Sequence, residues 1–247
     1  SDTFIYNKNK NILIANGNVE IIDKIKNIQI FSDNAVYEKT EEIITTNKNS
    51  KAIYETDKII TAVKFKYQKK ENILTASENV TVLDKTKDFF MKTNFLTYDK
   101  NFEKLTTKGK TDAQIQSKYE VFSEDVTYLI NKGDLSSDKQ TKIKDDKSQI
   151  YHLGKFKYLI NKEIVKGNEI VIITNFDKPK SDKFYFANAV IDLKNQKFFG
   201  KDTKAIIHKN VFDNPENDPR LVGVSAVADS RSTIVKKGIF TSCKETD

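Results

Sequence analysis

The chain has 247 residues, 31% of them charged, with a formal net charge of +7, and Arg220 and Arg231 are its only arginines. The lysine excess would attract an anionic partner, although codon usage in an AT-rich genome produces the same bias. The lysines are spread over the chain, with no arginine-rich segment and no known nucleic-acid motif, which argues against nucleic acid. No apolar run approaches 18 residues, so no segment is predicted to cross a membrane as a helix.

A unit of about 30 residues recurs along the chain and predicts a tandem repeat over residues 1–211. A marker tyrosine returns at intervals of 30 or 31 residues, and a seventh copy follows 33 residues later with isoleucine in its place. An apolar residue often stands two positions before the marker, and another follows six or seven positions after it. Each unit needs its neighbours to bury its apolar face, so the repeats should form one continuous body. The markers are Tyr6, Tyr37, Tyr67, Tyr98, Tyr128, Tyr158 and Ile191.

The local period within a unit is two, as in Val63–Tyr67, which places apolar side chains on one face of a strand. Turn residues divide a unit into about three strands, for example 41–46, 50–56 and 58–67. With an odd number of strands, equivalent strands of neighbouring units would run antiparallel. The predicted fold class is therefore all-β, an elongated antiparallel β-sandwich or β-jellyroll of about seven repeats rather than a parallel β-helix.

Residues 212–247 differ from the repeats and are predicted to be a polar tail. Two prolines within 213–219 end the strand pattern, and weak strand potential returns near Leu221–Val227 and Thr233–Phe240. Cys243 is the only cysteine, so it is either free or pairs with a residue outside this chain.

Candidate catalytic groups are few. His152 and His208 lie in different units and lack metal-ligand spacing, and no catalytic motif occurs. Adjacent acids such as Glu41-Glu42 and Asp145-Asp146 point to opposite faces of a strand and cannot converge on one atom. We therefore expect no enzyme activity, no metal and no cofactor; a sugar-cleaving carboxylate pair would be the enzymatic alternative, and no candidate stands out.

The alternating apolar residues have two interpretations. They either fill a core between two sheets, or line an apolar groove that shields acyl chains at about 0.8 kcal/mol for each buried methylene. The groove candidates are Ile12, Ile14, Val19, Ile21, Ile28, Ile30, Val63, Phe65, Tyr67, Val80, Val82, Phe95, Val126, Tyr128, Phe156, Tyr158, Ile170 and Ile172.

The units resemble the OstA-like repeats of the lipopolysaccharide-transport proteins. Gly17-Asn18-Val19-Glu20-Ile21 is similar to the G-N-V-x-I motif of that family, and Glu78-Asn79-Val80-Thr81-Val82 is a second copy without the glycine. Asp33-Asn34-Ala35-Val36-Tyr37 fits the part of the pattern that contains the tyrosine. The segments 217–223 and 237–244 look like the junction before the outer-membrane barrel in the LptD family, although the second cysteine and the barrel strands expected there do not follow.

The resemblance implies a periplasmic domain, in a Gram-negative bacterium, that passes lipopolysaccharide from the periplasmic bridge to an outer-membrane β-barrel with its plug lipoprotein. Lipid A acyl chains would travel inside the jellyroll without a cofactor, and energy would come from an ATPase at the inner membrane. The first sheet edge, with candidates Phe4, Tyr6, Ile12 and Ile14, would accept the bridge by strand addition.

Two alternatives stay open. One is a freestanding periplasmic bridge protein of the same system, although such proteins are shorter and lack this tail. The other is a rigid envelope scaffold whose core is filled. A continuous apolar groove would favour lipid transport, and its absence would favour the scaffold.

Overall fold

The computed structural model describes residues 1–178, 180–212, 214, 216–229 and 231–244. These residues form β-strands with two short 3-10 turns, and neighbouring strands pair antiparallel, which confirms the all-β antiparallel jellyroll. Contacts divide the chain into two compact units rather than one. The first unit comprises Ser1–Ser117 with Glu124–Asn131, and the second comprises Lys118–Ser123 with Lys132–Asp247.

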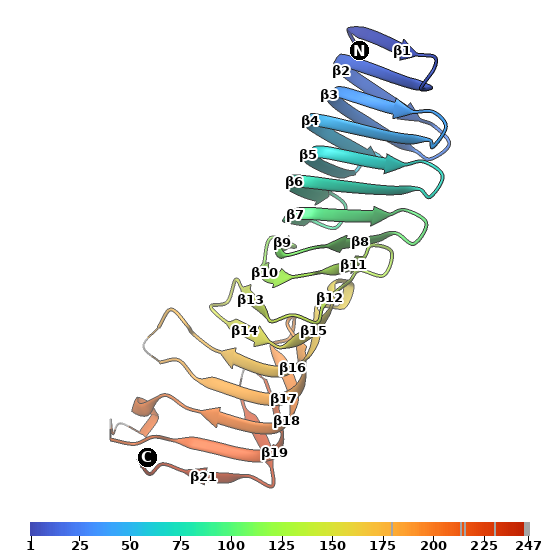
Figure 1. Cartoon of the computed structure of the whole chain (residues 1–247). Helices are drawn as coiled ribbons and strands as arrows, with labels where there is room; N and C mark the ends of the chain where they lie inside the picture. The colour runs from blue at the N-terminus through green and yellow to red at the C-terminus, as the bar shows by residue number, and fades with distance from the viewer. Residues whose placement is uncertain (179, 213, 215, 230, 245–247) are drawn as a thin grey trace. The chain divides into compact units, whose positions relative to one another are not determined.

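The first unit is a ladder in which each strand pairs with the next along the chain (Figure 1). β7 pairs with both β8 and β9, because these two short strands are the halves of what is elsewhere one long strand. The strands are β1 (Thr3–Asn7), β2 (Ile12–Asp23), β3 (Ile28–Glu38), β4 (Ile43–Tyr54), β5 (Lys58–Gln68), β6 (Ile73–Asp84), β7 (Phe89–Asp99), β8 (Lys104–Thr107), β9 (Lys110–Ile115) and β11 (Thr127–Leu129).

The repeats from β2 to β7 contain two long strands each, so the expectation of three is wrong there. The turn-forming residues at 47–50 and 77–79 do not end a strand; they bend β4 and β6 in the middle. Two strands per repeat also mean that equivalent strands such as β3 and β5 run in the same direction, because β4 lies between them. The sheet is antiparallel because consecutive strands pair, not because the number of strands is odd.

The bends of β2, β4 and β6 are β-bulges, in which two residues lie opposite one residue of the next strand, and the chain turns there from one wall of the jellyroll to the other. The pairing register shifts between Asn16 and Val19 in β2, and residues 17 and 18 have positive φ angles of 73° and 46°. Lys48 and Asn49 repeat this conformation in β4, as do Glu78 and Asn79 in β6. Gly-Asn before Val19 therefore supplies the two residue types that adopt the left-handed region most readily.

Buried hydroxyl groups form hydrogen bonds with backbone groups that the bulge leaves without a partner in the sheet. Ser50 Oγ lies 2.7 Å from Thr46 Oγ1 and donates to the Val63 carbonyl at 3.2 Å. Thr46 Oγ1 also accepts from the Phe65 backbone N–H at 3.2 Å. Because an unpaired buried backbone group is costly, these hydroxyls stabilise the bend and explain polar residues inside apolar strands.

The marker tyrosines end their strands and set the hairpin that follows. Tyr6 lies opposite Leu13, Tyr37 opposite Ile44, and Tyr67 opposite Leu74, so the partner comes seven residues later. The six-residue offsets expected for Ile12, Ile43, Ile73 and Ile164 are each one residue short. The residue five positions after the marker has a positive φ in every repeat, which closes the turn. These residues are Asn11, Glu42, Asn72, Glu103, Gly133, Glu163 and Gln196.

The second unit repeats this plan, and its sheet continues beyond residue 211. β19 pairs with β18 along its length, although it lies in the segment expected to be a tail. The strands are β10 (Tyr119–Glu124, whose last residue belongs to the first unit), β12 (Asp134–Ser137), β13 (Thr141–Asp145), β14 (Ile150–Leu153), β15 (Lys155–Leu159), β16 (Ile164–Ile173), β17 (Lys183–Asp192), β18 (Lys197–Ile206), β19 (Arg220–Ala228), β20 (Thr233–Lys236) and β21 (Ile239–Thr241), with 3-10 turns η1 (Ile160–Lys162) and η2 (Lys209–Phe212).

Candidate functional site: the interior between the two walls

The interior of the first unit lies between two walls made by the halves of the bent strands. We call the half-strands that carry the marker tyrosines, together with the half-strands that pair with them, the marker wall. The remaining halves form the opposite wall. In this unit the marker wall comprises residues 12–16, 34–38, 43–47, 64–68, 73–77, 95–99, 104–107 and 127–129, and the opposite wall comprises 19–23, 28–32, 50–54, 58–62, 80–84, 89–93 and 110–115.

A row of apolar side chains crosses the marker wall from strand to strand. Register places Leu13, Tyr37, Ile44, Tyr67 and Leu74 in succession, and the row continues through Tyr98 and Leu105 to Tyr128. From Ile44 onwards every member is at most 5% exposed. Burial raises the pKa of Tyr67 to about 12 and raises that of Tyr98 still further, so these phenols stay neutral in any physiological environment.

Most of the residues predicted to face inward are buried. Four are not in the inward rows. Ile12 and Ile14 alternate with Leu13 and Ala15, so they point to the other face of β2. Phe95 precedes the buried Leu96 and is 38% exposed, and Val63 lies in the bend of β5. The buried ones are Val19, Ile28, Ile30, Phe65, Tyr67, Val80, Val82, Val126, Tyr128, Phe156, Tyr158, Ile170 and Ile172, while Ile21 is partly exposed and lines a cavity.

Sequence reasoning missed several interior residues. Leu13, Ile44 and Leu74 lie opposite the marker tyrosines in the pairing register, whereas the six-residue offset predicted in those repeats points to the residue before each of them. The constant offset of seven would have identified them. Tyr54 and Phe89, on the opposite wall, carry no repeat marker and were not predicted to be interior.

Aromatic rings join the two walls in the middle of the first unit. The rings of Tyr54 on the opposite wall and Tyr98 on the marker wall meet edge to face, with centroids 4.8 Å apart. Phe89 also meets Tyr128 across the interior, but these two rings are stacked, with centroids 4.5 Å apart. Beside these rings the free cavity is only about 10 Å³. The walls are therefore in contact here, and the core is filled.

The β1 end of the first unit is hollow. A cavity of about 240 Å³ lies between the walls, and its lining is mostly aliphatic and aromatic. Glu20 and Lys69 are the charged residues among those that line it. Its lining residues are Phe4, Leu13, Ala15, Val19, Glu20, Ile21, Ala35, Tyr37, Ile44 and Lys69.

The second unit has the same two walls. Phe198 on its marker wall packs against Phe184 and Phe186 on the wall opposite, with ring centroids 5.2 Å and 5.1 Å apart. A cavity of about 330 Å³ lies beside Phe184 and Phe198, but charged residues such as Asp229 and Arg231 also line it. This cavity is thus more polar than the one at the β1 end.

Some tyrosine hydroxyls of the marker row have a hydrogen-bond partner and others do not. Tyr67 donates to Asn72, and Tyr98 donates to Glu103, each five residues further along the chain. Tyr128 and Tyr158 have buried hydroxyls without a hydrogen-bond partner among the described residues. Such unpaired groups are costly in a packed core.

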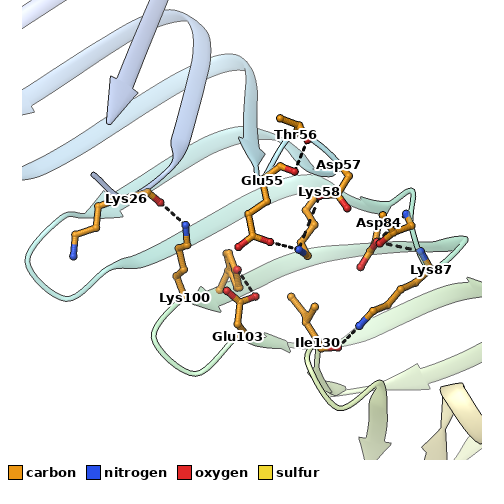
Figure 2. A network of polar contacts seen from close by, with 12 residues as sticks. Lys26, Glu55, Thr56, Asp57, Lys58, Asp84, Lys87, Lys100, Glu103 and Ile130 are labelled. Carbon is orange, nitrogen blue, oxygen red and sulfur yellow. Dashed lines mark hydrogen bonds and ion pairs between the residues drawn. The ribbon is translucent and has the colours of Figure 1, made fainter. Parts of the chain in front are cut away.

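Lysines close the mouth of the first unit, by which we mean the side where the turns of the two walls face each other. Lys100 donates to the backbone carbonyl of Lys26, and Lys87 donates to that of Ile130 (Figure 2). Lys69 Nζ lies 3.3 Å from Asp23 Oδ2. Each contact joins a turn or strand end of one wall to one of the other.

Neighbouring charges at the mouth are held by turn geometry. Burial by itself would raise the pKa of the Asp23 carboxyl, but the Lys26 backbone N–H and the Lys69 ammonium together hold it below its ordinary value. Lys58 bonds to Glu55 (Figure 2); burial opposes its charge, and the Glu55 carboxylate outweighs that effect and raises the pKa of Lys58. These pairs are ionised at neutral pH.

The candidate catalytic groups lie apart and have structural partners. His152 lies on the outer face of β14, where burial and then Lys142 lower its pKa, and His208 Nδ1 is 2.8 Å from Asp182 Oδ1. Asp145 accepts the Tyr151 hydroxyl at 2.9 Å and two turn amides. Over the described residues, no group of three or more histidine, cysteine or acidic side chains could hold a metal ion.

The first sheet edge is β1 alone. Phe4 and Tyr6, 64% and 50% exposed, lie on it as expected. Ile12 and Ile14 do not, because β2 pairs with β1 on one side and with β3 on the other. Cys243 is exposed at the far end of the chain, and its proposed pairing outside the chain stays a prediction.

No family model and no curated protein matches this chain. The helical turns in the described part of the chain are too short to cross a bilayer. The resemblance to OstA-like repeats stays a prediction from the sequence.

Proposed function

We propose that this chain is a non-enzymatic conduit for lipopolysaccharide, with acyl chains held between the two walls and sugars left in water. In this proposal it is the periplasmic OstA-like domain of an LptD-family protein. It would receive lipopolysaccharide from the periplasmic bridge and deliver it to an outer-membrane barrel with its plug lipoprotein.

The observation that carries the proposal is the apolar cavity of about 240 Å³ at the β1 end, continuous with the marker row. A long acyl chain needs apolar contact without directional bonds, and a row repeated from strand to strand offers the same surface at each step. Each methylene that leaves water contributes about 0.8 kcal/mol. The cavity is lined in part by Phe4 of β1, the strand to which the bridge would add in this proposal.

Passage beyond the cavity requires the walls to separate. The Tyr54–Tyr98 and Phe89–Tyr128 contacts fill the middle of the unit, and an acyl chain would replace them with its own apolar contacts. The unpaired hydroxyls of Tyr128 and Tyr158 support an interior that has not been optimised as a permanent core.

A filled-core scaffold is the second candidate, and the same ring contacts favour it. If the walls never separate, the 10 Å³ left beside Tyr54 admits no acyl chain. A freestanding bridge protein would use the same interior and would differ in its partners.

Photo-crosslinking separates the conduit from the scaffold. A photoreactive phenylalanine analogue at Phe65 or Phe156, both buried, should capture lipopolysaccharide in cells. The same analogue at the exposed neighbours Lys66 and Lys157 is the matched control and should capture little. Equal capture at inner and outer positions, or none at either, would reject the conduit and leave the scaffold.

A further inference from the structure

The lysines at the mouth occupy the boundary between the apolar interior and water. Lys100 Nζ lies 5.5 Å from the centroid of the Tyr54 ring, and Lys87 Nζ lies 5.9 Å from that of Tyr128. Both rings belong to the interior that the walls enclose. The ammonium groups are therefore held just outside the apolar layer, with their aliphatic stems beside it.

The present contacts of these lysines leave their charge available. Lys87 and Lys100 each reach a backbone carbonyl, which is neutral and cancels no charge. An ammonium has three donors, so one contact with a carbonyl does not exhaust it. Lys69 differs, because Asp23 balances it at 3.3 Å.

The same contacts bridge the mouth. Lys100 leaves the turn between β7 and β8 and reaches the turn between β2 and β3, which belongs to the other wall. Lys87 crosses in the opposite sense, from the turn between β6 and β7 to Ile130 (Figure 2). An acyl chain that entered sideways would have to break these contacts.

We propose that Lys69, Lys87 and Lys100 form a clasp that closes the mouth of the first unit and opens when phosphate groups of a bound lipid take over the ammonium groups. The inference rests on the proposed function and names the part of lipid A that the clasp would recognise. An ammonium group 5.5 or 5.9 Å from the centroid of an interior ring can contact a phosphate whose acyl chains lie against that ring. Phosphate offers ionised acceptor oxygens, whereas the backbone carbonyls that Lys87 and Lys100 now contact are neutral.

The first test measures the clasp without lipid. Spin labels on cysteines at Lys24 and Glu71, both exposed and in turns of opposite walls, report the width of the mouth in a Cys243→Ser background. The K69Q/K87Q/K100Q variant should show a longer and broader distance than the parent. The matched control K51Q/K66Q/K92Q removes the same charge from exposed outer positions and should leave the distance unchanged.

The second test asks whether phosphate opens the clasp. Lipid A carrying both phosphates should widen the mouth of the parent and bind it roughly tenfold more tightly than dephosphorylated lipid A. The K69Q/K87Q/K100Q variant should bind the two lipids alike, and the outer-lysine control should keep the preference. Millimolar inorganic phosphate alone should not widen the mouth.

The outcomes separate the clasp from the conduit. A short distance in the clasp variant, or a phosphate preference that survives in it, overturns the clasp even if lipid still crosslinks at Phe65. Opening by inorganic phosphate alone overturns the assignment to a lipid. Loss of all crosslinking at Phe65 in the parent rejects the conduit, while the distance in the clasp variant still tests whether the lysines hold the walls together.

Discussion

The rings of Tyr54 and Tyr98 meet at 88° across the interior, with centroids 4.8 Å apart, although the residues lie on β4 and β7. The rings of Phe89 on β7 and Tyr128 on β11 also meet across the interior, although these residues too lie far apart in the sequence. The opposite wall of one repeat therefore packs on the marker wall of a later repeat. A single repeat cannot complete its own interior, which is the energetic reason for a tandem array.

Truncating one of these rings should weaken the first unit far more than removing its hydroxyl. Tyr98→Ala leaves a void beside Tyr54 and should cost about 3 kcal/mol in the free energy of unfolding. Tyr98→Phe keeps the ring and loses only the hydrogen bond to Glu103, so it should cost about 1 kcal/mol. Urea unfolding followed by circular dichroism measures both. Equal losses would mean that the ring contact contributes little and that the walls are held by other means.

The turn after each marker should respond to glycine in a position-specific way. Glu42 has a φ of 53°, a region that costs residues other than glycine about 1 kcal/mol or more. Glu42→Gly should therefore stabilise the protein by about 0.5 kcal/mol after the loss of chain entropy in the unfolded state, and Glu42→Val should destabilise it. Thermal melting is sufficient to see both.

Glu41→Gly is the matched control for this turn. Glu41 is exposed and adjacent, and it is not among the residues with positive φ. Glycine there gains nothing and should be neutral or slightly destabilising. If both glycine variants behave alike, the left-handed turn does not limit stability.

Acid should weaken the Asp23–Lys69 contact at the mouth. The folded protein lowers the pKa of Asp23, so the carboxylate contributes stability that is complete above its unfolded pKa and is lost as the pH falls through the lower folded value. The melting temperature of the parent should exceed that of Asp23→Asn at neutral pH. The difference should shrink below about pH 4, where the reference carboxyl protonates.

A pH-independent difference between these two proteins would contradict that account. It would mean that the amide of Asp23→Asn disturbs the turn at Lys26 rather than removing a charge. Lys69→Gln distinguishes the cases, because it removes the ammonium and leaves the turn intact.

The repeat, the all-β class and the buried marker row could be predicted because they depend on local alternation. Phe65, Leu96, Val126 and Phe156, each two residues before a marker, are all at most 3% exposed. The number of strands could not be predicted in the same way. Asn-rich segments such as 47–50 suit a turn and a bulge equally, and only the pairing of both halves of β4 with β3 and β5 decides for the bulge.

The opposite wall and the mouth depend on contacts far apart in the sequence. Tyr54 and Phe89 are interior because the sheet folds over at its bends, and no spacing in the chain encodes which repeat they will meet. The role of the lysines at the mouth could not be predicted from the sequence either, since Lys87 and Lys100 have the same local sequence character as lysines on the outer faces. Only the turn that each one reaches distinguishes them.

The last prediction concerns the edge of β1, where the proposed bridge protein would add a strand. Adjacent residues in a strand direct their N–H groups to opposite sides, so one of Phe4 and Ile5 donates towards β2 and the other towards the free edge. Proline at the inward-donating position should detach β1 and lower the melting temperature. Proline at the outward-donating position should leave melting nearly unchanged and abolish association with the bridge protein, because the edge loses a ladder donor. Association that survives both substitutions would place the bridge on another surface.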